Sequence, residues 1–209
     1  MNNPNTNLEL VIKNSDLKEF TKVYAELTID AFIDEGVLKD IPVLGTVIGV
    51  MKFGNSIHRH LTAKKIYKFL YQLNSIPQEK RIAKINEINE SRKYQSSVGE
   101  MIFETLDKIE SDGKPEIIGK LFAAYIEEKI DFQIYLRLAF IVKSLFYYDL
   151  LDLKNITKKN VVTYSINDSI ATSGLIETDM IYINENDTEK KPQITLTSLG
   201  EFLILLGMK

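Results

Sequence analysis

The sequence predicts a mainly α protein, in which a multi-helix bundle is followed by a C-terminal α+β unit with a small β-hairpin. Apolar residues recur every three or four positions through most of the chain, as they do on the buried side of a helix. After Leu153 this spacing gives way to short apolar stretches that are typical of strands. The chain has 209 residues, of which 44% are hydrophobic, and this length can bury a core without disulfides.

The helical part divides at turn and capping residues. Ser75 and Gln78 form a capping-box pattern, which predicts that their side chains bond the free N–H groups at the start of a helix. Gly36 and the turn at 111–113 mark two helix ends. The expected helices are 17–31, 41–54, 56–73, 78–88, 96–109, 115–125 and 131–151.

The expected helix over 131–151 is rich in aromatic residues, namely Phe132, Tyr135, Phe140, Phe146, Tyr147 and Tyr148. Apolar residues occupy nearly every side of it, which predicts burial on all sides. We therefore expect a helical bundle over 1–130 and a second domain over 131–209, packed on the bundle through this long shared helix. A homodimer interface is the competing explanation for the surplus apolar surface.

The tail predicts a short helix over 165–174, strands over 180–183 and 193–196, and a closing helix over 197–206. Two segments stand out within this order, Ser173-Gly174-Leu175-Ile176 and Leu196-Thr197-Ser198-Leu199-Gly200. With them, the stretch from Asp131 to Lys209 resembles a winged-helix domain. The preceding 130 residues resemble no family that we can name.

The winged-helix resemblance implies a recognition helix and a wing, whose candidate contact residues are Asn167, Thr172, Lys190 and Lys191. Phosphate neutralisation by cations supplies most of the affinity of such domains for DNA. From Leu153 to Lys209 the chain has six Lys, no Arg and seven acidic residues. The charge therefore favours a protein partner, and a DNA-binding transcription regulator remains an alternative.

Residues 51–94 carry ten cations and three anions. Arg59, Lys64, Lys65 and Lys68 lie here and are the candidate contacts for an anionic partner or membrane. They follow the apolar run 41–51, so residues 41–73 could act as a membrane-surface or membrane-inserting effector. The competing interpretation places this helix beside acidic neighbours of its own fold, chiefly 100–112 and 26–35, with its cations in solvent.

The residues offer few catalytic arrangements. The absence of Cys excludes disulfides, thiolate catalysis and cysteine metal sites. His58 and His60 stand two apart on an expected helix and point in different directions, so no metal site is predicted. We expect no catalytic residue and no cofactor.

These observations favour a non-enzymatic bacterial interaction or regulatory protein, whose partner is another protein or a second copy of itself. The polar start of the chain lacks a signal-peptide pattern, so a cytoplasmic location is expected, with the membrane periphery as the alternative. Regulation, stress response and phage defence are all compatible settings.

Overall fold

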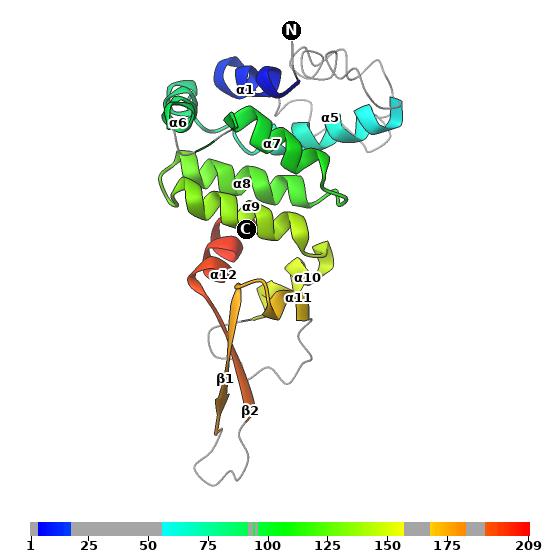
Figure 1. Ribbon diagram of the computed structural model, residues 1–209, viewed down its shortest axis with the longest axis vertical. Coiled ribbons are helices and arrows are strands. Elements are labelled where there is room, and N and C mark those ends of the chain that lie inside the picture. The colour runs from blue at the N-terminus through cyan, green and yellow to red at the C-terminus, as the bar shows by residue number, and fades with distance from the viewer. Residues whose placement is uncertain (1–3, 18–55, 92–93, 95, 157–167, 183–190) are drawn as a thin grey trace. The chain divides into compact units, whose positions relative to one another are not determined.

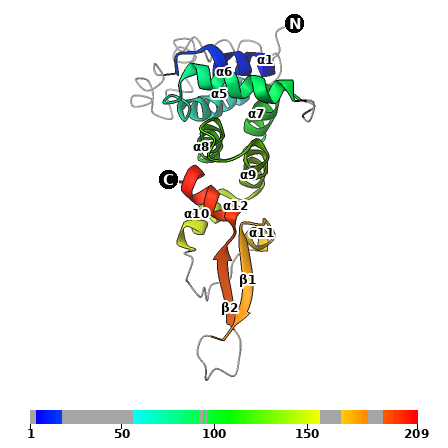
Figure 2. The same ribbon diagram turned by 90° about the vertical axis from the view of Figure 1, so that its left-hand side faces the viewer.

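The computed structural model describes residues 4–17, 56–91, 94, 96–156, 168–182 and 191–209 (Figures 1 and 2). Over these residues the fold is mainly helical with one two-stranded antiparallel sheet, which confirms the predicted fold class. The chain divides into two compact units, Met1–Asp131 and Phe132–Lys209. The helices expected over 17–31 and 41–54 lie outside the described residues, apart from Leu17.

The first unit contains five described helices: α1 (Pro4–Asn14), α5 (Ser56–Tyr71), α6 (Gln78–Glu90), α7 (Val98–Asp107) and α8 (Lys114–Ile126). The apolar spacing indicated the last four but not α1. Contacts join α5 to α7 and α8, and α1 to α6 and α7. In both views α1 and α8 lie at opposite sides of the unit, with α7 between them (Figures 1 and 2).

Helix α5 provides much of the buried surface of this unit. Its fully buried apolar residues, all with 0% exposure, are Ala63, Ile66, Tyr67, Phe69 and Leu70. Helix α8 approaches it closely at Gly119, where a Cβ atom would lie 2.7 Å from the Phe69 carbonyl oxygen. The Phe69 and Phe122 rings are 5.7 Å apart between centroids. Only a residue without a side chain permits this spacing, so Gly119 sets the α5–α8 contact.

Helix α1 is held by a buried apolar side and by polar links to α6. Leu8 and Ile12 are both fully buried. Lys13 Nζ donates to Asn86 Oδ1 over 2.7 Å, and Asn89 Nδ2 donates to a Glu9 carboxylate oxygen over 2.7 Å. These contacts join residues more than seventy positions apart, so α1 is an integral part of the first unit.

The capping-box prediction at Ser75 is wrong. Helix α6 begins at Gln78, its N-cap is Pro77 in an extended conformation, and no side chain caps it. Ile76 is 4% exposed, and its N–H bonds the Leu73 carbonyl oxygen over 3.1 Å. Because burial of Ile76 draws residues 72–76 into the turn that follows α5, Ser75 is too early to cap α6.

The second unit contains α9 (Phe132–Ser144), α10 (Tyr147–Asp152), a 3₁₀ turn (Leu153–Asn155), α11 (Asp168–Ala171), β1 (Ile176–Ile181), β2 (Lys191–Leu196), α12 (Ser198–Phe202) and a π-helical turn (Leu203–Gly207). The two strands form a hairpin that extends away from the helices of this unit (Figures 1 and 2). The strand predicted over 193–196 is confirmed within β2, whereas the one predicted over 180–183 overlaps β1 only at Met180 and Ile181, because β1 begins four residues earlier than expected.

The prediction of one long helix over 131–151 is wrong. The chain breaks between α9 and α10 at Phe146, whose backbone is extended at φ −65° and ψ 139°. The expected burial on all sides is wrong too, because Phe140, Phe146 and Tyr148 are each more than 60% exposed. Aromatic side chains have modest helix propensity, and three of them follow Leu145 in succession.

The base of the hairpin is fixed by the two segments that the sequence singled out. Thr197 N–H bonds the Leu175 carbonyl oxygen over 3.0 Å, and the Thr197 hydroxyl donates to the Gly174 carbonyl oxygen over 2.7 Å. Gly174 has a φ of +81°, which an L side chain rarely adopts. A Cβ atom on Gly200 would lie 2.2 Å from the Leu175 carbonyl oxygen. The two segments are therefore held together by hydrogen bonds and close backbone packing, and they form one corner at the base of the hairpin.

Candidate functional site

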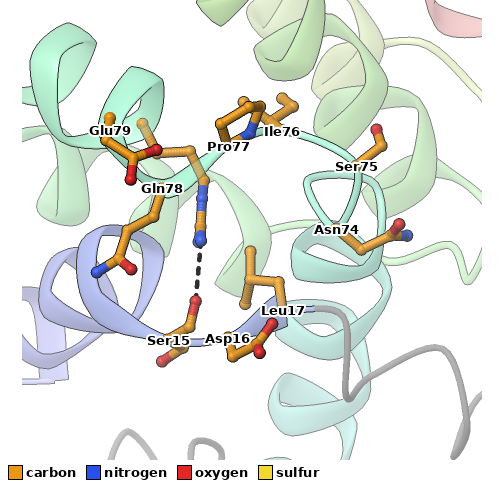
Figure 3. A pocket seen from close by; sticks show the side chains of 10 residues that line it. Ser15, Asp16, Leu17, Asn74, Ser75, Ile76, Pro77, Gln78 and Glu79 are labelled. Atoms are coloured by element: carbon orange, nitrogen blue, oxygen red, sulfur yellow. Dashed lines mark hydrogen bonds between the residues drawn. The ribbon is translucent and has the colours of Figure 1, made fainter.

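A cavity of about 340 Å³ lies in the first unit, where the end of α1 faces the loop between α5 and α6. Figure 3 shows Ser15, Asp16 and Leu17 on one side and the 74–79 segment opposite them. Its lining residues are Ser15, Asp16, Leu17, Asn74, Ser75, Ile76, Pro77, Gln78, Glu79 and Arg81. The wall thus combines hydroxyl, amide and carboxylate groups with one guanidinium and three apolar side chains.

Arg81 is the buried charge of this cavity, with only 3% of its surface exposed. Its Nη1 donates to the Ile12 carbonyl oxygen over 2.6 Å, and its Nη2 donates to the Ser15 carbonyl oxygen over 2.9 Å (Figure 3). The last carbonyl groups of a helix have no partner within it. Arg81 therefore supplies donors to the C-terminal end of α1.

The guanidinium of Arg81 is only partly satisfied. Its Nε is the one buried side-chain nitrogen or oxygen atom among the described residues that has no hydrogen-bond partner. Burial lowers the pKa of Arg81, and the nearby carboxylates of Asp16 and Glu79 act in the opposite direction. An unmade hydrogen bond of a buried charged group is costly, and this nitrogen is itself shielded from solvent.

The sequence analysis did not single out Arg81, although the spacing of this residue carries a signal. Arg81, Ile85 and Ile88 are separated by four and three residues, which places them on one side of α6. All three are buried. Arg81 occupies a position where the helical spacing calls for an apolar residue. This misplaced cation was the signal in the sequence that could have indicated the site.

The candidate cations of α5 contact the turn between α7 and α8. Lys64 is 7% exposed, and its Nζ donates to Asp112 Oδ2. Lys68 Nζ donates to the Asp112 carbonyl oxygen over 2.8 Å and lies 3.9 Å from a Glu116 carboxylate oxygen. These partners include the acidic neighbours that the competing interpretation expected, but the two lysines are largely withdrawn from solvent rather than hydrated.

Lys65 and the N-terminal half of α5 meet the end of α7. Lys65 Nζ donates to the Asp107 carbonyl oxygen over 3.2 Å, and burial lowers its pKa against the opposing effect of Asp107. Asp107 Oδ1 accepts a hydrogen bond from Thr62 Oγ1 over 3.2 Å and lies 3.1 Å from His58 Nε2. Arg59, the fourth candidate cation, is partly exposed.

The candidate contacts of the tail are only partly described. Asn167 and Lys190 lie outside the described residues, as does most of the loop expected between the strands. Thr172 is exposed after α11, and its hydroxyl donates to the Asp168 carbonyl oxygen over 2.8 Å. Lys191 begins β2 opposite Ile181. Of the four candidate contacts, only Thr172 and Lys191 therefore lie within the described residues.

The two faces of the hairpin differ in chemistry. Residues directly opposite each other share a face, so Met180 and Thr178 lie on the same side as Ile176 and Ile194. Tyr182 directly follows β1, and both Met180 and Tyr182 are 56% exposed. Glu177 and Asp179 lie on the opposite face and are exposed. The face with Met180 thus carries no charged residue, and the opposite face carries the carboxylates of Glu177 and Asp179 together with Lys191.

No group of three or more His, Cys, Asp or Glu side chains among the described residues could hold a metal ion. None of the described helices has both the length and the apolar character needed to cross a membrane.

In the comparisons with known proteins, no family model, no curated protein and no solved structure matched this chain.

Proposed function

We propose that this chain is a non-enzymatic, cytoplasmic interaction protein that associates with a second copy of itself. Its C-terminal unit would act as a winged-helix-like module that binds protein rather than nucleic acid. The observation that carries the proposal is the pair of exposed apolar residues at the end of β1, Met180 and Tyr182, together with the carboxylates of Glu177 and Asp179 on the other face of that strand. A regulatory role in a bacterial cell, in stress response or phage defence, would suit such a protein.

Exposed apolar side chains support an interaction role for the second unit. In the described part of this unit, six large apolar side chains are at least half exposed: Phe140, Phe146, Tyr148, Met180, Tyr182 and Leu205. Aromatic residues and Met are enriched in protein interfaces, where they supply most of the apolar contact area. A face that gathers such residues on a projecting hairpin is suited to a protein partner.

The charge of the hairpin argues against DNA as the partner. A wing that lies beside a phosphate strand needs cations, whereas Glu177 and Asp179 form an exposed anionic pair on β1. These carboxylates would repel the phosphate backbone at neutral pH. The acidic pair therefore favours a protein over a nucleic acid.

The same carboxylates determine which surfaces of two copies can pack together. Pairing two β1 strands edge to edge would place Glu177 and Asp179 of one copy beside those of the other, and like charges on neighbouring strands are unfavourable. Packing the apolar faces against each other brings Met180 and Tyr182 together and keeps the carboxylates in water. Because this centre is small compared with a standard interface of about 1,600 Å², we expect a weak, concentration-dependent dimer.

Sedimentation velocity over a wide range of protein concentration tests this proposal. We expect the wild-type chain to shift from monomer to dimer as its concentration rises. The double variant Met180→Ser/Tyr182→Ser should remain monomeric, because it removes the apolar centre. The matched control Glu177→Gln/Asp179→Asn, on the opposite face of the same strand, should dimerise at least as well as wild type.

Two results would overturn the proposal. The first is a wild-type chain that remains monomeric at every concentration, or a Met180→Ser/Tyr182→Ser variant that dimerises like wild type. The second is binding of a random-sequence duplex at physiological salt, measured by fluorescence anisotropy and lost in Lys190→Ala/Lys191→Ala. That second result would identify a DNA-binding regulator instead.

A further inference from the structure

The hairpin of the second unit has an unusually open strand, β1. Its residues 177–180 are all exposed, so neither face of the strand is covered over this stretch. In the described part of the chain, β2 is the only strand that pairs with β1 (Figures 1 and 2). An isolated pair of strands is marginally stable, because each strand leaves one edge of main-chain groups without a strand partner.

The register determines which main-chain groups of β1 face its free edge, the edge away from β2. Thr197 N–H bonds the carbonyl oxygen of Leu175, which lies directly opposite it when the register is continued by one pair. Bonded and non-bonded pairs alternate along an antiparallel ladder, so the odd-numbered residues of β1 direct their main-chain groups towards β2. Thr178 and Met180 therefore direct their N–H and carbonyl groups to the free edge.

The two outer edges of the hairpin differ in their donors. Pro192 of β2 lies opposite Met180, at a position whose main-chain groups also face outward. Proline has no N–H group, so the outer edge of β2 lacks a donor at this position. β1 contains no proline, and no hydrogen bond from the described residues reaches the outward groups of Thr178 or Met180. The free edge of β1 is therefore the edge at which a further strand can pair.

The side chains beside this edge limit what that strand can be. Glu177 and Asp179 are exposed on one face of β1 and have no ion-pair partner among the side chains that the structure describes. Lys191 shares this face but belongs to β2, which lies on the other side of β1 from an added strand. Side chains directly beside each other on adjacent strands attract when their charges are opposite and repel when they are alike. A second copy of β1 would bring carboxylates, whereas a strand with Lys or Arg at alternate positions brings the complementary charge.

We propose that β1 binds an extended basic segment of a partner protein as a third strand, with cations at alternate positions beside Glu177 and Asp179. Main-chain hydrogen bonds to Thr178 and Met180 supply affinity, and the two carboxylates supply sequence preference. The proposal rests on the protein-binding role proposed above for the hairpin. Its occupant is a different protein, however, and it uses the edge of β1 rather than the apolar face that would join two copies.

A synthetic peptide of alternating lysine and threonine, titrated into the full-length chain, tests the proposal. The titration is made with wild type and with Met180→Ser/Tyr182→Ser, in which self-association is not expected to compete. Amide hydrogen exchange, followed by ¹H–¹⁵N spectra, should slow at least roughly ten-fold at residues 178 and 180 when the peptide saturates the protein. The amides of Glu177 and Asp179 already face β2, so their exchange should change less.

Methylated peptides separate strand pairing from charge attraction. Only one edge of an added strand faces β1, and the amides that face it occur at alternate residues. N-methylation of one alternate set of peptide amides should therefore abolish binding, whereas N-methylation of the other set should not. Both peptides keep every lysine, so charge attraction alone would not distinguish them.

Variants of β1 test the edge and the charges separately. Thr178→Pro removes one outward N–H group and no hydrogen bond to β2, and it should weaken binding of the lysine–threonine peptide at least roughly ten-fold. A peptide of alternating glutamate and threonine should not bind wild type. The charge-reversed variant Glu177→Lys/Asp179→Lys should bind this acidic peptide and lose the basic one.

The proposal is overturned if millimolar lysine–threonine peptide leaves the exchange at residues 178 and 180 unchanged in both proteins. It is also overturned if the two methylated peptides bind equally, or if the acidic peptide binds wild type as tightly as the basic one. Protection of these amides without peptide, rising with protein concentration, would identify a second copy as the occupant instead. A wild type that remains monomeric while the peptide binds would contradict only the dimer, so the two proposals fail separately.

Discussion

The hydroxyl of Thr197 donates a hydrogen bond to the carbonyl oxygen of Gly174 over 2.7 Å, although the two residues are 23 positions apart in the chain. The same hydroxyl oxygen accepts a bond from Gly200 N–H over 3.2 Å, and so caps α12. One side chain therefore ties the turn before β1 to the helix after β2. Both strands of the hairpin leave from this corner.

Thr197→Val should remove both hydrogen bonds of this side chain and leave the Gly174 carbonyl and the Gly200 N–H without it. Loss of an N-cap alone costs about 1 kcal/mol, and we expect a total decrease of about 1–3 kcal/mol in the free energy of unfolding. Urea denaturation followed by circular dichroism measures it. Thr178→Val, an exposed position on β1, is the control and should change stability by less than about 0.5 kcal/mol.

Gly200→Ala and Gly174→Ala should differ in severity, although the two glycines belong to the same corner. At Gly200 a Cβ atom would lie 2.2 Å from the Leu175 carbonyl oxygen, so the backbone must move and we expect a loss of about 3 kcal/mol or more. At Gly174 there is open space, and only its positive φ opposes alanine, at about 1–2 kcal/mol. Equal losses in denaturant melts would show that the close approach at Gly200 is not rigid.

Glu128→Gly should stabilise the protein. Glu128 follows the end of α8 with a φ of +62°, a conformation that glycine adopts without strain and glutamate does not. The variant also loses an ion pair with Lys84, whose Nζ lies 2.9 Å from the carboxylate, but the Glu128 side chain is exposed and Lys84 keeps its pair with Glu87, so this loss is small. Glu127→Gly, one residue earlier at a φ of −81°, should instead lower the melting temperature. Calorimetry of the two variants beside wild type checks the opposite signs.

Tyr125 should make stability fall at alkaline pH. Burial, the largest cause, and the nearby Glu87 raise the pKa of its hydroxyl from 10.0 to about 12, while Lys84 has the opposite effect. Between these values the unfolded chain releases the phenolic proton and the folded chain retains it. The folded state then binds more protons, so its stability decreases as pH rises from about 10 to 12.

Urea denaturation at several pH values in this interval measures the effect of Tyr125. Tyr125→Phe should reduce the alkaline loss of unfolding free energy, and a loss as steep as that of wild type would contradict the prediction. Burial also raises the pKa of Tyr135, so part of the loss should remain in that variant. Tyr148→Phe, at a residue that is 64% exposed, should have the same pH profile as wild type.

The helices with regular apolar spacing were predictable because their buried residues are the ones that the period selects. Ala63, Ile66 and Leu70 of α5 are all fully buried, as their separations of three and four residues require. The sequence pattern did not predict helix α1. Its apolar residues Leu8, Val11 and Ile12 are too few to distinguish a helix from a polar arm, unless the residues of α6 and α7 that they contact are already known. Where these partners lie is set by tertiary packing.

The candidate site was harder to predict for a related reason. The sequence reveals that Lys64 and Lys68 are cations, but their pairing with Asp112 depends on how the 108–113 turn folds back on α5. Similarly, the cavity is formed by α1 and a loop more than fifty residues later. Only the position of Arg81 in the helical period of α6 pointed to a buried charge.

The contacts of Lys64 and Lys68 with Asp112 reduce the positive charge that α5 can offer to a polyanion. The net charge of a sequence segment counts every cation equally. An approaching phosphate instead experiences the electrostatic field of the folded protein, in which carboxylates already offset part of the charge of these lysines. Lys64 and Lys68 each already donate to an oxygen of Asp112, so part of their charge is offset within the first unit before any phosphate approaches.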